Sequence, residues 1–246
     1  MKFNDGLIGN EYNNRILQWY SSDNEEKYLD NLKTQPEDWY YRNATIEYRF
    51  NDYGHRSKQI NELDFDNYIL FTGCSHTEGV GIELEKTYPY LLAKLLNVDY
   101  YNMAVQGTGI DVVEYNLLSW FAKFNKKPKF VVIQWPDHSR FLSQYPGYEN
   151  FIPNGTWAKD KNFEKFFAAG EISGFYNARK HISYKLIYNV LDVPIIGVYI
   201  ASLRAYDGKS VGVRRLDKAR DMQHSGIRTN EDTANRLLHH IGTLNI

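Results

Sequence analysis

From residue 67 onward the sequence alternates between short apolar segments and longer amphipathic ones. The apolar segments predict buried strands at residues 68–72, 98–103, 130–135 and 193–200. The other segments predict helices at residues 87–96, 109–124, 162–189 with a break near 170–174, and 230–241 with Thr229 or Asn230 as its cap. Strands and helices that alternate in this way form a parallel sheet covered on both faces and joined by right-handed crossovers. The sequence therefore predicts an α/β domain with three layers.

Residues 1–62 precede this pattern and show no sustained periodicity. Within them, residues 21–26 have the composition of a helix start, and residues 44–50 alternate like a half-buried strand. We expect this region to be an N-terminal extension packed on the domain formed by residues 63–246. Further along, residues 136–162 are predicted to be a long irregular loop that contributes to substrate choice.

The charge balance and the cysteine content exclude several kinds of partner and fold. The chain has 246 residues, 29 of them basic and 30 acidic, so its formal net charge is −1. So small a net charge gives no field that would draw the protein to nucleic acid or to an anionic membrane. Cys74 is the single cysteine, which excludes an intrachain disulfide. Because there is neither an apolar N-terminal signal nor a run of roughly 18 apolar residues, we expect a soluble protein, cytoplasmic or virion-associated.

The sequence contains no pattern typical of a metal or cofactor site. His239 and His240 are neighbours on a predicted helix and do not readily share one metal ion. Residues 107–109 begin and end with glycine but do not complete a dinucleotide-binding motif. We therefore expect no cofactor, while the sequence leaves the oligomeric state open.

Ser75 lies where the first predicted strand runs into a tight turn. A serine in such a place becomes a nucleophile when a histidine reaches it, because its own hydroxyl is barely ionised at neutral pH. Asp221 and His224 have the spacing that lets a carboxylate orient an imidazole within one turn of chain. Sites in parallel sheets form beyond the carboxyl ends of the strands, and each predicted strand is followed by a candidate: Ser75, Gly107, His138 and the pair Asp221 and His224. The pattern indicates a hydrolase that acts on esters.

Three segments resemble, in this order, the first, second and fifth sequence blocks of the SGNH (GDSL-type) hydrolases: Gly73-Cys74-Ser75-His76-Thr77, Asn102-Met103-Ala104-Val105-Gln106-Gly107 and Asp221-Met222-Gln223-His224. The resemblance covers residues 66–242 and implies a flavodoxin-like α/β/α fold. It also implies that Ser75 attacks an acyl carbonyl, that His224 takes and returns the proton, and that Asp221 fixes the histidine tautomer. The backbone N–H groups of Ser75 and Gly107 would hold the oxyanion, since a glycine lets the backbone approach closely.

Two positions depart from the pattern of this family. Cys74 stands where the family commonly has Asp, although that side chain is not part of the proton relay. The third block normally supplies an Asn whose amide completes the oxyanion hole, but residues 135–140 contain no Asn. Loss of one such donor typically costs about a hundred- to a thousand-fold in rate, unless His138 or Arg140 supplies a replacement hydrogen bond. We expect His76 to shape the turn or to line the pocket.

These features favour a serine esterase that removes a small acyl group such as acetyl. A carbohydrate ester is the favoured substrate because residues 145–157 are rich in aromatic side chains. Acyl transfer to a sugar hydroxyl is a related alternative. The missing Asn favours an alternative of another class, a catalytically degenerate binding or structural module of a virion or a surface. Three simpler alternatives also stay open: Ser75 only caps the next segment, Asp221 and His224 belong to a surface loop, or Cys74 is the nucleophile.

Overall fold

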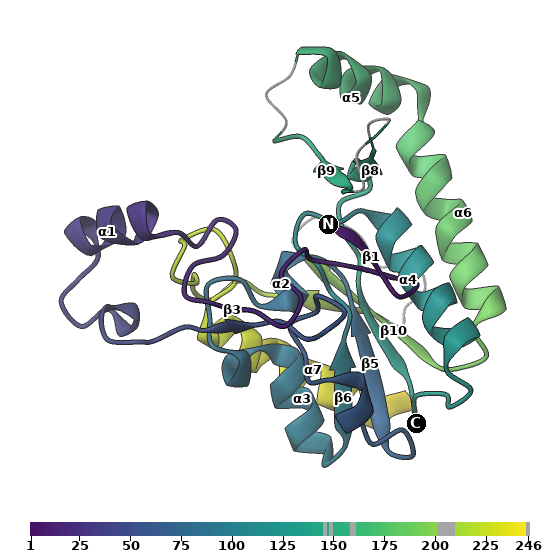
Figure 1. Cartoon of the computed structure of the whole chain (residues 1–246), viewed down its shortest axis with the longest axis horizontal. Helices are drawn as coiled ribbons and strands as arrows, with labels where there is room; N and C mark the ends of the chain where they lie inside the picture. The colour runs from purple at the N-terminus through teal and green to yellow at the C-terminus, as the bar shows by residue number, and fades with distance from the viewer. Residues whose placement is uncertain (145–146, 148–149, 158–160, 201–209, 245–246) are drawn as a thin grey trace.

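A five-stranded parallel sheet forms the centre of the computed structural model, which describes residues 1–144, 147, 150–157, 161–200 and 210–244 (Figure 1). The strand order is β11-β10-β7-β5-β6, with bounds Ser210–Val213, Ile195–Ile200, Val131–Gln134, Tyr68–Thr72 and Asp99–Asn102. Counted along the chain within the sheet and read from the β6 edge, this order is 2-1-3-4-5, as in flavodoxin-like folds. The predicted fold class is therefore confirmed.

Helices cover both faces of the sheet and complete the three layers (Figure 1). One face carries α4 (Ile110–Lys123) and α6 (Phe175–Val190), and the other carries α3 (Tyr88–Leu96) and α7 (Ile227–Leu244). None of the helices in the described part of the chain is both long and apolar enough to cross a membrane.

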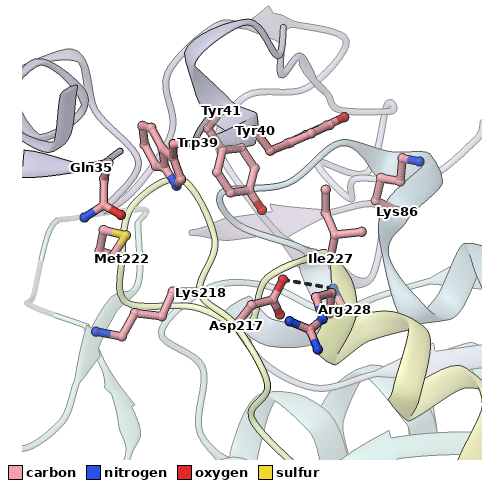
Figure 2. Close-up of a pocket in the computed structure, with 10 residues that line it drawn as sticks. All are labelled: Gln35, Trp39, Tyr40, Tyr41, Lys86, Asp217, Lys218, Met222, Ile227 and Arg228. Carbon is pink, nitrogen blue, oxygen red and sulfur yellow. Dashed lines mark hydrogen bonds between the residues drawn. The ribbon is translucent and has the colours of Figure 1, made fainter. Parts of the chain in front are cut away.

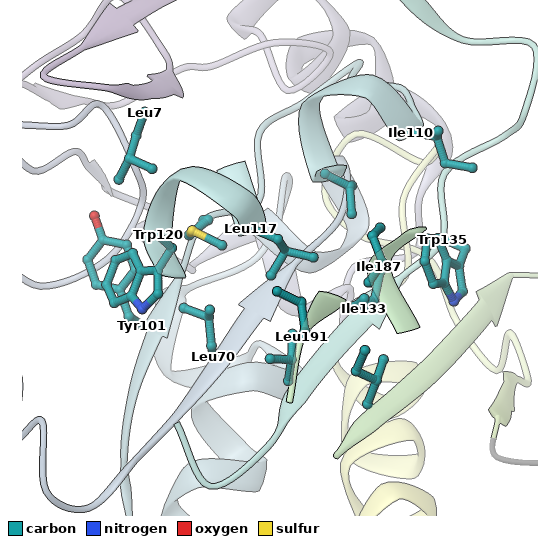
Figure 3. Close-up of a cluster of buried hydrophobic side chains, with 14 of the residues drawn as sticks. Leu7, Leu70, Tyr101, Ile110, Leu117, Trp120, Ile133, Trp135, Ile187 and Leu191 are labelled. Atoms are coloured by element: carbon teal, nitrogen blue, oxygen red, sulfur yellow. The ribbon is translucent and has the colours of Figure 1, made fainter. Parts of the chain in front are cut away.

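Each strand divides its side chains between two hydrophobic cores. Along β5, Leu70 belongs to the core beneath α4 and α6, whereas Ile69 and Phe71 belong to the core beneath α3 and α7. Figure 3 shows the first of these cores, in which Leu117 and Trp120 of α4 lie near Leu70. Since each fully buried apolar side chain stabilises the fold by about 1.5–3 kcal/mol, the two cores hold the strand ends in fixed positions.

The predicted strands and helices are present, with differences at their ends. The predicted third helix is two helices, α5 (Lys161–Ser173) and α6, and it breaks as expected at Gly174, which has a φ of +68°. β11 was not predicted, because its four residues are too few to show a hydrophobic pattern. It pairs in parallel with β10 after residues 201–209, which lie outside the described residues.

The predicted cap of the last helix is wrong, because α7 begins at Ile227 and contains both Thr229 and Asn230. The carboxylate of Asp217 accepts hydrogen bonds from the backbone N–H groups of Arg228 at 3.0 Å and of Thr229 at 2.9 Å. A side chain ten residues upstream therefore satisfies the free N–H groups of the first turn, and no local capping residue is needed.

The N-terminal residues form small elements against the domain. β1 (Lys2–Asn4) and β2 (Leu7–Gly9) form an antiparallel hairpin. The hairpin is tied to α4 by Asn116, whose side chain accepts from the Ile8 N–H and donates to the Ile8 carbonyl, both at 2.8 Å. The predicted helix is present as α1 (Glu25–Thr34), capped by the side chain of Asn24.

The predicted strand at residues 44–50 is reduced to β4 (Tyr48–Arg49), which pairs with β3 (Ile16–Leu17). Its alternation is nevertheless real, because Ile46, Tyr48 and Phe50 are buried while the residues between them are exposed. Within the described residues, short 3₁₀ helices lie in the connections: η1 (Tyr40–Arg42), η2 (Ile60–Glu62) and η3 (Leu84–Lys86).

The stretch at residues 136–162 is less irregular than predicted. It contains an antiparallel hairpin of β8 (Phe141–Ser143) and β9 (Ile152–Asn154), and its last residues begin α5. Figure 1 shows this hairpin beyond one end of the central sheet, beside α5. Of the aromatic-rich residues 145–157, residues 145, 146, 148 and 149 lie outside the described residues.

Candidate active site

The turn after β5 requires a glycine. Gly73 has a φ of +153°, and a Cβ atom there would lie 2.6 Å from Thr77 Oγ1 and 2.8 Å from the Gln134 carbonyl oxygen. The chain then enters α2 (Ser75–Glu78), a helix of one turn in which Ser75 is the first residue. Ser75 is buried, with 7% of its surface exposed, and its hydroxyl bonds to His224 rather than capping α2.

Gln134 at the end of β7 anchors this turn. Its Oε1 accepts hydrogen bonds from the Cys74 N–H at 3.2 Å, from Cys74 Sγ at 2.9 Å and from Thr77 Oγ1 at 3.4 Å. Cys74 is buried and faces Gln134, so its thiol is engaged away from the Ser75 hydroxyl. Sequence reasoning missed Gln134, although a polar residue at the end of an otherwise apolar strand is a usable signal.

The hydroxyl of Ser75, the imidazole of His224 and the carboxylate of Asp221 form a continuous chain of hydrogen bonds. His224 Nε2 lies 2.7 Å from Ser75 Oγ, and His224 Nδ1 lies 2.6 Å from Asp221 Oδ2. Because an ionised carboxylate only accepts hydrogen bonds, Nδ1 carries the proton and Nε2 is left to accept from the serine. The structure thus brings together three side chains from opposite ends of the domain.

The loop that carries Asp221 and His224 has its own internal support. Met222 has a φ of +59°, and this turn lets the N–H groups of Gln223 and His224 both donate to Asp221 Oδ1 at 3.0 Å. Burial raises the pKa of Asp221, but hydrogen bonds from His224 and Ser22 outweigh burial and hold that pKa well below its ordinary value of 3.8. Asp221 is therefore ionised at neutral pH.

The N-terminal extension reaches this loop through Ser22 and Asp23. Ser22 Oγ donates to Asp221 Oδ2 at 2.6 Å. Asp23 pairs with Arg220, whose Nε and Nη2 lie 2.9 and 2.7 Å from its carboxylate oxygens, and both side chains are almost fully buried. Sequence reasoning missed these contacts, because nothing near residues 22 and 23 indicates a partner about two hundred positions away. The residue next to Asp221 in the chain is thus fixed by the extension.

The backbone N–H groups of Ser75 and Gly107 are the expected donors to an oxyanion. Within the described residues, neither the Ser75 N–H nor the Gly107 N–H donates a hydrogen bond. Gly107 has a φ of +69°, and a Cβ atom there would lie 3.2 Å from the Cβ of Pro153 in β9. Both the backbone conformation and the closeness of β9 therefore favour glycine at this position.

His76 lies beside the proposed base. Its ring centroid is 4.8 Å from that of His224, and its Nδ1 lies 3.1 Å from Ser225 Oγ. Burial, with smaller electrostatic effects from His224, Arg140 and Arg215, lowers the pKa of His76 to about 3. Its imidazole is therefore neutral at pH 7.

The two candidate replacements for the missing Asn lie in different surroundings. The His138 ring packs edge-on against Tyr176, 5.9 Å between centroids, and its buried Nδ1 has no partner among the described residues. The Arg140 guanidinium lies 4.9 Å from the ring centroid of Trp157, a side chain that also approaches Gly107. Neither side chain contacts Ser75 directly among the described contacts. The described residues contain no cluster of His, Cys, Asp or Glu that could hold a metal ion.

No family model and no curated protein matches the chain. The chain is, however, similar to several solved structures. An acetyl xylan esterase, Est2A from Butyrivibrio proteoclasticus, is 16% identical over 76% of this chain and 66% of its own, with a TM-score of 0.43. A carbohydrate esterase described as having divergent catalytic and non-catalytic binding functions is 18% identical over 72% of this chain and 65% of its own, with a TM-score of 0.43.

A third similar structure is the psychrotrophic esterase EstA from a Pseudoalteromonas species, 11% identical over 74% of this chain and 100% of its own, with a TM-score of 0.45. The chain spans slightly less than two thirds of the length of the two carbohydrate esterases. The similar structures thus include carbohydrate esterases and a smaller esterase, all at low identity.

Proposed function

We propose that this protein is a serine esterase of the SGNH type that hydrolyses a small acyl ester, such as an acetyl ester, on a carbohydrate. The observation that carries the proposal is the hydrogen-bonded chain from Ser75 Oγ through the His224 imidazole to the Asp221 carboxylate, with distances of 2.7 and 2.6 Å. Nucleophile, base and orienting carboxylate in this geometry are the parts that acyl transfer to a serine requires.

In the first half of the proposed reaction, Ser75 Oγ attacks the ester carbonyl carbon while its proton passes to His224 Nε2. Asp221 stabilises the imidazolium that results, because its carboxylate accepts the Nδ1 proton throughout. The tetrahedral oxyanion is held by the N–H groups of Ser75 and Gly107, which have no other acceptor in the described chain. His224 then gives its proton to the leaving alcohol, and an acyl-enzyme on Ser75 remains.

In the second half, His224 removes a proton from water, the resulting hydroxide equivalent attacks the acyl carbonyl, and Ser75 leaves with the proton from His224. An acid and the free enzyme are the products. If a sugar hydroxyl takes the place of water, the same steps give acyl transfer. A missing third oxyanion donor predicts a modest rate, lower by about a hundred- to a thousand-fold than that of a complete site.

The carbohydrate part of the proposal is supported by the aromatic side chains around the site. Trp157 lies beside Gly107, and the Arg140 guanidinium lies over its ring, so an exposed aromatic side chain stands next to the proposed oxyanion hole. The two acetyl- and carbohydrate-esterase structures to which the chain is similar favour the same substrate class.

Turnover of p-nitrophenyl acetate by the adjacent variants Ser75→Ala and Cys74→Ala tests the proposal. We expect Ser75→Ala to lose at least about a thousand-fold in kcat/KM and Cys74→Ala to keep most of the activity. Release of acetate from an acetylated oligosaccharide should depend on Ser75 in the same way. Equal rates for wild type and Ser75→Ala would remove Ser75 from the mechanism, and loss of activity in Cys74→Ala alone would favour the thiol.

A further inference from the structure

A pocket of about 510 Å³ lies where the N-terminal extension meets the loop between β11 and α7 (Figure 2). The extension contributes Gln35 and the aromatic residues 39–41, and the loop contributes Asp217, Lys218 and Met222. Met222 directly follows Asp221, so the pocket and the proposed catalytic relay share one loop. Its volume is within the range of about 300–1,000 Å³ that is typical of small-ligand sites.

Three aromatic side chains, Trp39, Tyr40 and Tyr41, line the extension side of this pocket. Tyr40 is 49% exposed and Trp39 is partly exposed, so a ligand can reach their rings. The Trp39 ring is held in place by an edge contact with Tyr41 at 5.3 Å and by stacking on Tyr28 at 6.2 Å between centroids. Rings that are fixed before binding lose little conformational freedom on binding, and they suit the apolar face of a sugar ring.

One polar group of the pocket, the buried hydroxyl of Tyr41, lacks a hydrogen-bond partner among the described residues. A buried hydroxyl without a partner is destabilising, so a ligand hydroxyl that reached it would offset that cost. This favours a ligand rich in hydroxyl groups over a purely apolar one.

The charges around the pocket favour an anionic ligand. Lys86, Lys218 and Arg228 line it, and none of the three forms an ion pair with a described carboxylate. The one lining carboxylate, Asp217, is already engaged by the N–H groups of Arg228 and Thr229 and by the Thr229 hydroxyl. Three cationic side chains thus line the pocket together with one carboxylate, which caps α7. This local excess contrasts with the formal net charge of −1 for the whole chain.

We propose that the pocket binds a sugar unit that carries a carboxylate, belonging to the saccharide whose ester is cleaved at Ser75. A uronic acid matches each feature of the pocket. The aromatic rings suit the apolar face of the sugar, the Tyr41 hydroxyl suits a sugar hydroxyl, and the unpaired cations suit the carboxylate. The link to the ester rests on the proposed function, whereas binding itself requires no turnover.

The test uses the full-length Ser75→Ala protein, which binds without consuming a substrate. Calorimetric titration with a trimer of galacturonic acid and with the matching trimer of galactose compares an anionic and a neutral ligand of the same size. We expect the acidic trimer to bind at least about ten-fold more tightly, with an advantage that shrinks as salt rises from 50 to 200 mM. Equal affinity for the two trimers, or no binding of the acidic one, would overturn the proposal.

Two further variants in the Ser75→Ala background locate the binding. Lys218→Glu changes an exposed side chain without hydrogen bonds among those described, and Trp39→Ala removes the ring; each should weaken binding of the acidic trimer at least about ten-fold. Lys94→Glu on α3 is the matched control and should bind normally. Unchanged affinity in Lys218→Glu and Trp39→Ala would place the ligand elsewhere.

The two proposals fail separately. An active esterase that binds neither trimer keeps the proposed function and loses the sugar pocket. A protein that binds the acidic trimer but shows no Ser75-dependent turnover keeps the pocket and loses the proposed function.

Discussion

Asp221 accepts hydrogen bonds from His224 Nδ1, from Ser22 and from two backbone N–H groups, so its charge and position are both tightly defined. Asp221→Asn keeps the shape but places an amide against Nδ1, which favours the histidine tautomer that cannot accept the serine proton. We expect kcat to fall by about 10³- to 10⁴-fold with an unchanged fold. Steady-state kinetics with circular dichroism as the folding check measure this, and Asp30→Asn on the exposed surface of α1 is the control. An unchanged kcat would show that His224 is not oriented through Asp221.

The raised pKa of Glu78 makes the stability of the fold depend on pH. Glu78 is fully buried in α2 and accepts hydrogen bonds from Asn10 and Tyr20, at 2.9 and 3.0 Å. Burial raises its pKa from 4.5 to about 7. Because the folded chain binds this proton more tightly than the unfolded chain does, the stabilising contribution is fully present below about pH 4.5 and is lost as pH rises through 7.

Replacing Glu78 with Gln removes the carboxyl group whose protonation couples stability to pH. The stability of Glu78→Gln relative to wild type should therefore increase between pH 5 and pH 8, by on the order of 1–3 kcal/mol. Urea unfolding at both pH values measures the difference. A difference that does not change with pH would show that Glu78 does not titrate in this range.

At the scale of elements, the extension and the catalytic loop are joined by the buried pair of Asp23 and Arg220. Trp19 adds to the contact, because its ring lies 4.2 Å from the Arg220 guanidinium carbon. Removing one partner of a buried ion pair leaves an uncompensated charge, so Asp23→Ala should lower the free energy of unfolding by about 3–5 kcal/mol. Activity should fall as well, since Arg220 precedes Asp221.

A double-mutant cycle separates the coupling between Asp23 and Arg220 from the destabilisation that each substitution causes by itself. Asp23→Ala combined with Arg220→Met should be less destabilised than the sum of the two single variants, because no buried charge is left alone. The exposed pair of Lys33 and Asp30 is the matched control, and Asp30→Ala should change stability by less than about 1 kcal/mol. Strict additivity of the Asp23 and Arg220 effects would contradict a direct coupling.

At the scale of the whole molecule, the extension shares the core of the domain. Leu7 and Ile60 belong to the same buried cluster as Trp120 of α4. We therefore expect a chain that begins at residue 63 to expose this apolar surface and to fail to give a soluble, cooperatively unfolding protein. Size-exclusion chromatography and thermal unfolding of the shortened chain measure this. A stable, fully active fragment would show that residues 1–62 are dispensable.

The fold could be predicted from the sequence where the signal is local. The apolar segments that became β5, β6, β7 and β10 and the amphipathic segments between them were enough to specify the α/β class. The start of α7 and the presence of β11 could not be predicted. Asp217 caps α7 from ten positions away, and β11 has only four residues, so neither leaves a periodic pattern nearby.

The candidate site could be predicted in part for the same reason. The tight turn after a strand was enough to name Ser75, and a three-residue spacing was enough to name Asp221 and His224. The structure brings these side chains into hydrogen-bond contact. Ser22 and Asp23 could not be named, because a contact with a residue about two hundred positions away has no local signature. Their roles follow from tertiary structure alone.

We propose above all that Ser75 is a nucleophile activated by His224. Reaction of the wild-type protein with a fluorophosphonate probe, followed by peptide mass spectrometry, tests this most directly. We expect stoichiometric modification of Ser75 in the wild type and almost none in His224→Ala. An unmodified Ser75 in the folded wild-type protein, or equal labelling in His224→Ala, would contradict it.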